Sequence, residues 1–168
     1  MKKFAVACLF LLGFILLETG ILSNMLFLPA VPDFVLLCSL YFSLQNGRLF
    51  GVSAGFTGGI LLDFLTACPF GFNSLLRTVL GSGAGFFNKT LNIKGIFFPV
   101  LLGAVFTLSK ALAVHVISAF YPNISVSYRI FSSSFGFELL FNSLLTPVIF
   151  RFLDVFKDYL ILTPEKVS

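Results

Sequence analysis

Six apolar segments, separated by short turns, follow one another along almost the whole chain. They cover residues 4–26, 31–46, 49–67, 73–88, 96–118 and 130–153, of which the second and fourth are short. A helix needs roughly 20 apolar residues to cross a membrane, so little chain is left for a soluble domain. We therefore expect an all-α membrane protein with six transmembrane helices in one bundle, a single domain over residues 1–168, and a cytoplasmic tail at 154–168.

The composition supports this class and argues against metal or cofactor chemistry. Hydrophobic residues make up 58% of the chain and charged residues only 11%, against roughly 25% charged residues in soluble domains. Cys8, Cys38 and Cys68 lack CxxC spacing, and His115 is the single histidine. These residues cannot form a usual zinc site or a Cys/His nucleophile pair. We expect no cofactor, no metal and no catalytic set.

Basic residues are distributed unequally between the two sides of the expected bundle. With six crossings both termini lie on one side, which carries eight basic residues against one on the other. Because cytoplasmic loops carry the excess of Lys and Arg, both termini are expected in the cytoplasm. The net charge of +4 then reflects topology and contact with anionic lipid rather than nucleic-acid binding. The eight are Lys2, Lys3, Arg48, Lys89, Lys94, Arg151, Lys157 and Lys166, and the one is Arg129.

The two ends of the chain each allow two interpretations. The start, MKKFAVACLFLLGFILL, has the charge and apolar run of a signal peptide, but no small-residue cleavage site follows, so we expect a retained first span. Residues 151–162 place apolar and charged side chains on opposite helical faces. That segment is either an amphipathic helix along the inner membrane surface or an extension of the last span.

Four glycines at a spacing of four, Gly47, Gly51, Gly55 and Gly59, line one face of the third apolar segment. In lipid, helices associate through close backbone approach, and small residues at this spacing permit it. Asp63 follows at the next position and would cost roughly 3 kcal/mol near the membrane centre. The segment is therefore expected to pack inside the bundle or against another protein. Packing within the chain and a partner interface both remain open.

Six ionisable residues fall within the expected spans, in the outer half of the membrane: Glu18, Asp63, Arg77, Lys110, His115 and Glu138. Asp63 and Arg77 lie about five residues either side of one outer turn, which predicts an ion pair between them. Lys110 and Glu138 lie about eight residues either side of the next outer loop and form a second level pair. Glu18, Lys110 and Glu138 are interpreted either as structural pairs or as an outward-opening polar pocket. His115 is expected to be a hydrogen-bonding residue.

An ordered set of residues between positions 31 and 87 resembles a known family. Pro32-Asp33-Phe34 opens an apolar span, the four glycines follow with Phe56 and Leu62-Asp63, and Pro69-Phe70-Gly71-Phe72-Asn73 precedes Gly81, Gly83 and Gly85. This set resembles the MreD family of bacterial rod-shape-determining membrane proteins, whose length and six-span layout also fit. The motif positions Pro32, Asp33, Phe56, Asp63, Pro69 and Gly71 carry over as candidate packing and partner contacts.

The resemblance implies a non-enzymatic inner-membrane component of the cell-elongation machinery that binds the single-span protein MreC. Through that complex it would be linked to the MreB filament and to the SEDS-family glycosyltransferase and penicillin-binding transpeptidase that build lateral-wall peptidoglycan. It also implies a fold similar to the S components of energy-coupling-factor transporters. The outer-half charges favour an alternative, a substrate-binding S-type subunit of a vitamin transporter. A membrane enzyme acting on lipid or peptidoglycan precursors is a third reading, and a second copy of the chain is a further candidate partner.

Overall fold

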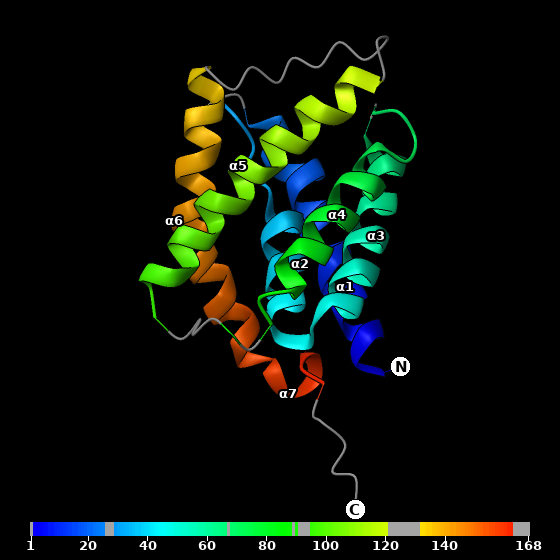
Figure 1. Cartoon of the computed structure of the whole chain (residues 1–168), viewed down its shortest axis with the longest axis vertical. Coiled ribbons are helices and arrows are strands. Elements are labelled where there is room, and N and C mark those ends of the chain that lie inside the picture. The colour runs from blue at the N-terminus through cyan, green and yellow to red at the C-terminus, as the bar shows by residue number, and fades with distance from the viewer. Residues whose placement is uncertain are drawn as a thin grey trace, which may run out of the picture.

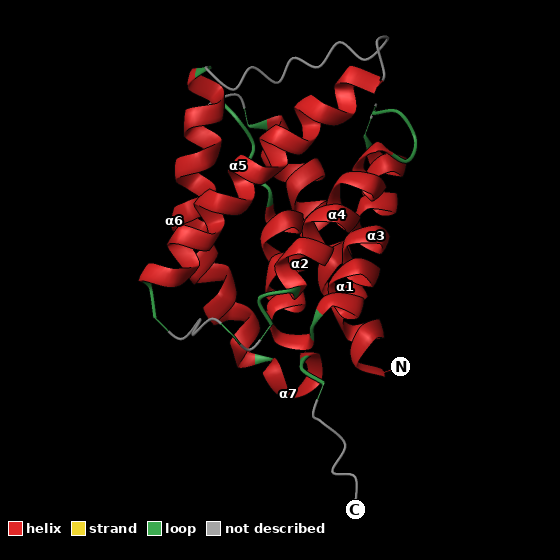
Figure 2. Ribbon diagram, viewed as in Figure 1, coloured by secondary structure: helices red, strands yellow, loops and turns green. Residues whose placement is uncertain are grey.

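The computed structural model describes residues 2–25, 29–66, 68–88, 90, 95–120 and 132–162. Over these residues the chain is helical and contains no strand, as Figures 1 and 2 show. The elements are α1 (Lys2–Leu16), the π-helical η1 (Leu17–Ile21), the 3-10 turn η2 (Leu22–Asn24), α2 (Phe34–Asn46), α3 (Arg48–Leu65), α4 (Phe72–Gly85), α5 (Phe97–Phe120), α6 (Ser133–Val155) and α7 (Lys157–Leu160).

The helices begin and end within three residues of the six predicted apolar segments. Within the described ranges, four are long and apolar enough to cross a membrane: Lys2–Asn24, Arg48–Leu65, Phe97–Ala119 and Ser133–Val155. The other two, α2 and α4, have 13 and 14 residues. The chain is thus an all-helical membrane protein, and the two short helices coincide with the two short segments of the sequence.

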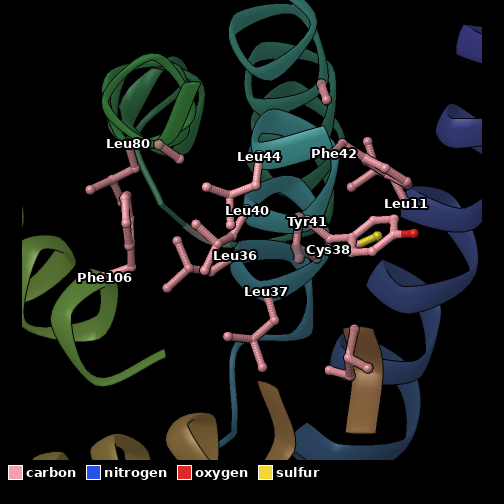
Figure 3. Close-up of a cluster of buried hydrophobic side chains, with 14 of the residues drawn as sticks. Leu11, Leu36, Leu37, Cys38, Leu40, Tyr41, Phe42, Leu44, Leu80 and Phe106 are labelled. Atoms are coloured by element: carbon pink, nitrogen blue, oxygen red, sulfur yellow. The ribbon is translucent and has the colours of Figure 1, made fainter. Parts of the chain in front are cut away.

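Helix α2 forms the centre of the hydrophobic core. Every residue from Val35 to Leu44 is buried, so the helix has no polar or lipid-facing side. Its side chains point in several directions in Figure 3, with Leu11 of α1, Leu80 of α4 and Phe106 of α5 among the surrounding core residues. A helix that is apolar on all sides is typical of a protein core or of a membrane span.

Two antiparallel helix pairs pack around this centre. Helices α3 and α4 lie side by side, and α5 contacts α6 but runs obliquely to it, crossing the view from the side of α6 (Figure 1). The α5–α6 pair has its own close approach, because a Cβ added at Gly103 would lie 2.1 Å from Oγ1 of Thr146. The α5–α6 pair joins the rest of the molecule through contacts of α6 with α2 and of α5 with α4.

The start of α1 and the short helix α7 lie at the same end of the molecule (Figure 1). Helix α6 ends at Val155, the chain turns at Phe156, and α7 packs against α1 with the side chain of Leu160 fully buried. The Nζ of Lys3 donates a hydrogen bond to the carbonyl oxygen of Ile161. Residues 157–160 therefore form a separate helix folded against α1 rather than a straight extension of α6.

Candidate functional site

The N-terminus of α2 is capped by side chains from three helical segments. Oδ1 of Asp33 accepts a hydrogen bond from the N–H of Leu36 at 2.8 Å, and Oε2 of Glu18 accepts one from Val35 at 3.3 Å. Oδ1 of Asn142 accepts one from the N–H of Asp33 at 2.9 Å. With 13 residues α2 is about 20 Å long, less than the roughly 30 Å hydrocarbon core. Its first turn cannot rely on water, so these side chains satisfy the N–H groups that every helix start leaves unpaired.

The carboxylate of Asp33 also forms ion pairs with one basic residue from each of two other helices. Nη1 and Nη2 of Arg77 lie 2.8 and 3.1 Å from its two carboxylate oxygens, a bidentate arrangement. Nζ of Lys110 lies 2.6 Å from Oδ2. Asp33 is 2% exposed and Arg77 4% exposed, so this pairing takes place away from solvent. Asp33 was expected only as a family motif position, and the structure places it at the centre of the buried charges.

The same cluster extends to α6. Nζ of Lys110 lies 2.8 Å from Oε1 of Glu138, so the pair predicted from the spacing of these residues is present. Next to it, Nδ2 of Asn142 donates to Oγ1 of Thr107 at 3.1 Å, and both residues are fully buried. We call Asp33, Arg77, Lys110 and Glu138, with the capping residues Glu18 and Asn142, the charge cluster. Its members come from η1, from the residue before α2, and from α4, α5 and α6.

The predicted pair between Asp63 and Arg77 is wrong. Oδ2 of Asp63 accepts hydrogen bonds from the N–H of Gly71 at 3.0 Å, from the N–H of Ser74 at 3.1 Å and from the hydroxyl of Ser74 at 2.7 Å. Oδ1 accepts from the N–H of Asn73 at 2.9 Å. Asp63 therefore caps α4 and does not belong to the charge cluster. The first N–H groups of α4 have no partner within their own helix, and they bind the carboxylate of Asp63 instead. The side chain of Arg77 is directed towards α2.

The α3–α4 turn explains two further motif residues. Gly71 has φ of +93°, a left-handed conformation that L side chains rarely adopt, and its N–H is one of those bound by Asp63. Pro69 supplies the carbonyl that accepts from the N–H of Phe72 at 3.1 Å. Pro32 is buried directly before Asp33, whereas Phe56 is 50% exposed on α3. Most of the motif thus builds a turn and a helix start.

Gly51, Gly55 and Gly59 of α3 face α4. A Cβ added at Gly51 would lie 2.6 Å from the carbonyl oxygen of Gly81, one at Gly55 2.3 Å from that of Arg77, and one at Gly59 2.4 Å from Cα of Ser74. This face of α3 is therefore filled by a helix of the same chain. Gly47 has another role, because it ends α2 with φ of +91° and a Cβ there would meet nothing closer than 3.8 Å.

Sequence reasoning missed two buried polar residues, Asn142 and Thr107. The predicted polar residues of the spans were all ionisable. An uncharged Asn inside an apolar segment also needs hydrogen-bond partners in lipid. That signal was present in the sequence at Asn142 of the last span. Asp33 was predicted as a family motif position, but its place among the buried charges was not, because it lies at the edge of an expected span, where a carboxylate is accessible to water.

The chemistry of the charge cluster is that of a structural network. Its carboxylates and cations bind one another and the start of α2. Among all residues that the structure describes, no group of three His, Cys, Asp or Glu side chains could hold a metal ion. Nε of Arg77 is buried and finds no hydrogen-bond partner in the described part of the chain, which leaves one donor of the cluster unused.

Comparison with known proteins gives one family. Comparison with curated proteins and with solved structures finds no match. The family model described as "rod shape-determining protein MreD" matches residues 1–156 of the 168-residue chain. This match covers every helix that contributes to the charge cluster and the glycine-packed α3–α4 pair, and the chain belongs to the MreD family of rod shape-determining proteins.

Proposed function

We propose that this chain is a non-enzymatic membrane scaffold of the bacterial cell-elongation complex. In this role it binds MreC and helps position lateral-wall peptidoglycan synthesis by the SEDS glycosyltransferase and the penicillin-binding transpeptidase. The same complex links it to the MreB filament. The observation that carries the proposal is the family match over residues 1–156. The charge cluster supports it, because charged side chains that bind one another hold helices together.

We further propose that all six helices cross the inner membrane, with both termini in the cytoplasm. Helices α2 and α4 are short, and residues 29–33 continue the path of α2 without helical structure. Irregular backbone at membrane depth is tolerated where it is buried in protein, as Pro32 and Asp33 are. The eight-to-one distribution of basic residues sets the orientation. A single six-helix domain of this kind is similar to the S components of energy-coupling-factor transporters.

The geometry restricts where a partner helix binds. The glycine face of α3 is covered by α4, so Gly51, Gly55 and Gly59 serve packing within the chain. We therefore place the contact with MreC on an exposed apolar face of the bundle. Gly83, where a Cβ would meet nothing within 4 Å, lies on the other side of α4 and is open to such a contact.

Depletion of this protein in a rod-shaped host that carries it is expected to round the cells, because wall synthesis loses its position along the cell cylinder. Re-expression of the chain should restore rods, and MreC should co-purify with it from detergent-solubilised membranes. Cell width and immunoblots for MreC measure the two results. Rod-shaped depleted cells, or purification without MreC, would contradict the scaffold proposal.

A second candidate function is a substrate-binding S-type subunit of a vitamin transporter. It is favoured by the buried Nε of Arg77, an unused donor in the described residues beside the N-terminus of α2. Short helices whose N-termini meet polar groups inside the membrane form substrate sites in transporters. A rise in the thermal unfolding midpoint with one of a panel of water-soluble vitamins would support this function. Absence of any shift, together with rounding that no nutrient corrects, would reject it.

A further inference from the structure

A groove of about 730 Å³ lies between the beginnings of α1 and α3. Phe4 and Ala5 line it from α1, and Leu49, Phe50 and Ser53 line it from α3. The rings of Phe4 and Phe50 meet edge to face with centroids 5.4 Å apart, while Leu49 is 83% exposed. We call this the N-terminal groove.

The third wall of the groove comes from the segment that follows α7. Asn46 donates to the carbonyl oxygen of Leu160 at 3.1 Å and accepts from the N–H of Leu162 at 2.6 Å, which holds Leu162 against the groove. The hydroxyl of Ser53 donates to the carbonyl oxygen of Leu49 at 2.9 Å. The polar groups of the lining are thus already hydrogen-bonded to the protein. What remains for a ligand is an apolar surface suited to a hydrocarbon chain.

Positive charge surrounds this end of the molecule. Lys2 is exposed next to the groove residues of α1, and the Nζ of Lys3 binds Ile161, the neighbour of the lining residue Leu162. Of the described residues near this end, five are basic and two are acidic: Lys2, Lys3, Arg48, Arg151 and Lys157 against Asp154 and Asp158. An apolar groove beside the lysines that begin α1 complements a molecule with a hydrocarbon tail and an anionic head.

We propose that the N-terminal groove binds an anionic phospholipid of the adjacent leaflet, with one acyl chain in the groove and the headgroup phosphate at Lys2 and Lys3. Zwitterionic lipids offer the same acyl chains but carry no net charge, so they bind the groove more weakly. Each lysine near an anionic headgroup is expected to raise the preference about fivefold. This site is separate from the charge cluster and does not depend on the scaffold function.

The test uses a single fluorescent reporter, because the chain contains no tryptophan. Leu49→Trp places one in the groove, and Val148→Trp places one on α6, 60% exposed and three residues from Arg151. Each variant is reconstituted in phosphatidylcholine vesicles that contain dibrominated phosphatidylglycerol or dibrominated phosphatidylcholine. Quenching at L49W should show a preference for phosphatidylglycerol of about fivefold or more. Quenching at V148W should show nearly equal affinity for both lipids.

Two substitutions separate a defined site from general attraction of anionic lipid to a basic surface. In the L49W background, Lys2→Gln should reduce the preference about fivefold. Neither lysine lines the groove itself, but Lys2 lies two residues before the lining residue Phe4, whereas Lys157 lies five residues before Leu162. Lys157→Gln removes an equal charge at the same end and should change the preference less than twofold. Equal preference at both reporters, or equal effects of K2Q and K157Q, would overturn the proposal.

Discussion

Replacing Asp33 with alanine is expected to lower the free energy of unfolding by about 3–5 kcal/mol, because it leaves Arg77 and Lys110 buried near the start of α2 with a partner removed. The same change removes the N-cap of α2, which contributes about 1 kcal/mol more. Thermal or denaturant unfolding of the purified protein in detergent micelles, followed by circular dichroism, measures the loss. Asp158→Ala is the matched control, because Asp158 is exposed and its removal should change stability by less than about 0.5 kcal/mol.

A double-mutant cycle identifies the partner of Arg77. Asp33→Asn and Arg77→Met together should cost less than the sum of the two single changes by about 1–3 kcal/mol, because the double variant leaves Lys110 matched with Glu138. Asp63→Asn with Arg77→Met should be additive within about 0.5 kcal/mol, since Asp63 binds the start of α4 and not Arg77. A larger coupling for Asp63 than for Asp33 would show that Arg77 is paired as the sequence alone suggested.

Replacing Gly55 with alanine is expected to destabilise the protein by about 3 kcal/mol, because the added Cβ would lie 2.3 Å from a backbone oxygen of α4. Neither backbone can move without separating α3 from α4 along the whole glycine face. The same substitution at Gly83 meets no atom within 4 Å and should be neutral or stabilise by up to about 1 kcal/mol through helix propensity. The difference between the two unfolding midpoints is the measurement.

The pair of glycine variants also tests where MreC binds. If Gly55→Ala kept wild-type stability and yet abolished co-purification of MreC, the glycine face would be a partner interface and the packing of α4 against it would be wrong. If Gly83→Leu abolished co-purification and kept stability, the open face of α4 would be part of the MreC contact. Circular dichroism of each purified variant separates loss of fold from loss of binding.

The positions of the helices could be predicted from hydropathy, because apolar runs and turn residues mark where each helix begins and ends. The level of a side chain along its helix axis could be predicted as well, since it follows from the number of residues between that side chain and the nearest turn. The pair of Lys110 and Glu138 follows from height alone, because α5 and α6 are neighbours. Height does not give the direction of a side chain around its helix. Arg77 and Asp63 were therefore paired by height, although they point to different neighbours.

Which helices become neighbours depends on packing across the whole chain, and local sequence does not record it. The spacing of Gly51, Gly55 and Gly59 predicts close approach of some helix, and only the folded bundle shows that this helix is α4. The central place of α2 has a sequence signal in its nearly continuous apolar run. That Glu18 and Asn142 bind the start of α2 has no local sequence signal, because they lie 15 residues before and 109 residues after Asp33.

The caps of α2 set an order of events during synthesis. Asp33 is translated long before Arg77, Lys110 and Asn142, so for a period its carboxylate lacks its ion-pair partners and its N–H lacks Asn142, whereas the N–H groups of Val35 and Leu36 already have Glu18 and Asp33 as acceptors. Each later helix then supplies one of the missing partners, and α6 supplies the last one. The contacts at the start of α2 are therefore complete only after the final hairpin has been added. Until then Asp33 depends on water or on the insertion machinery.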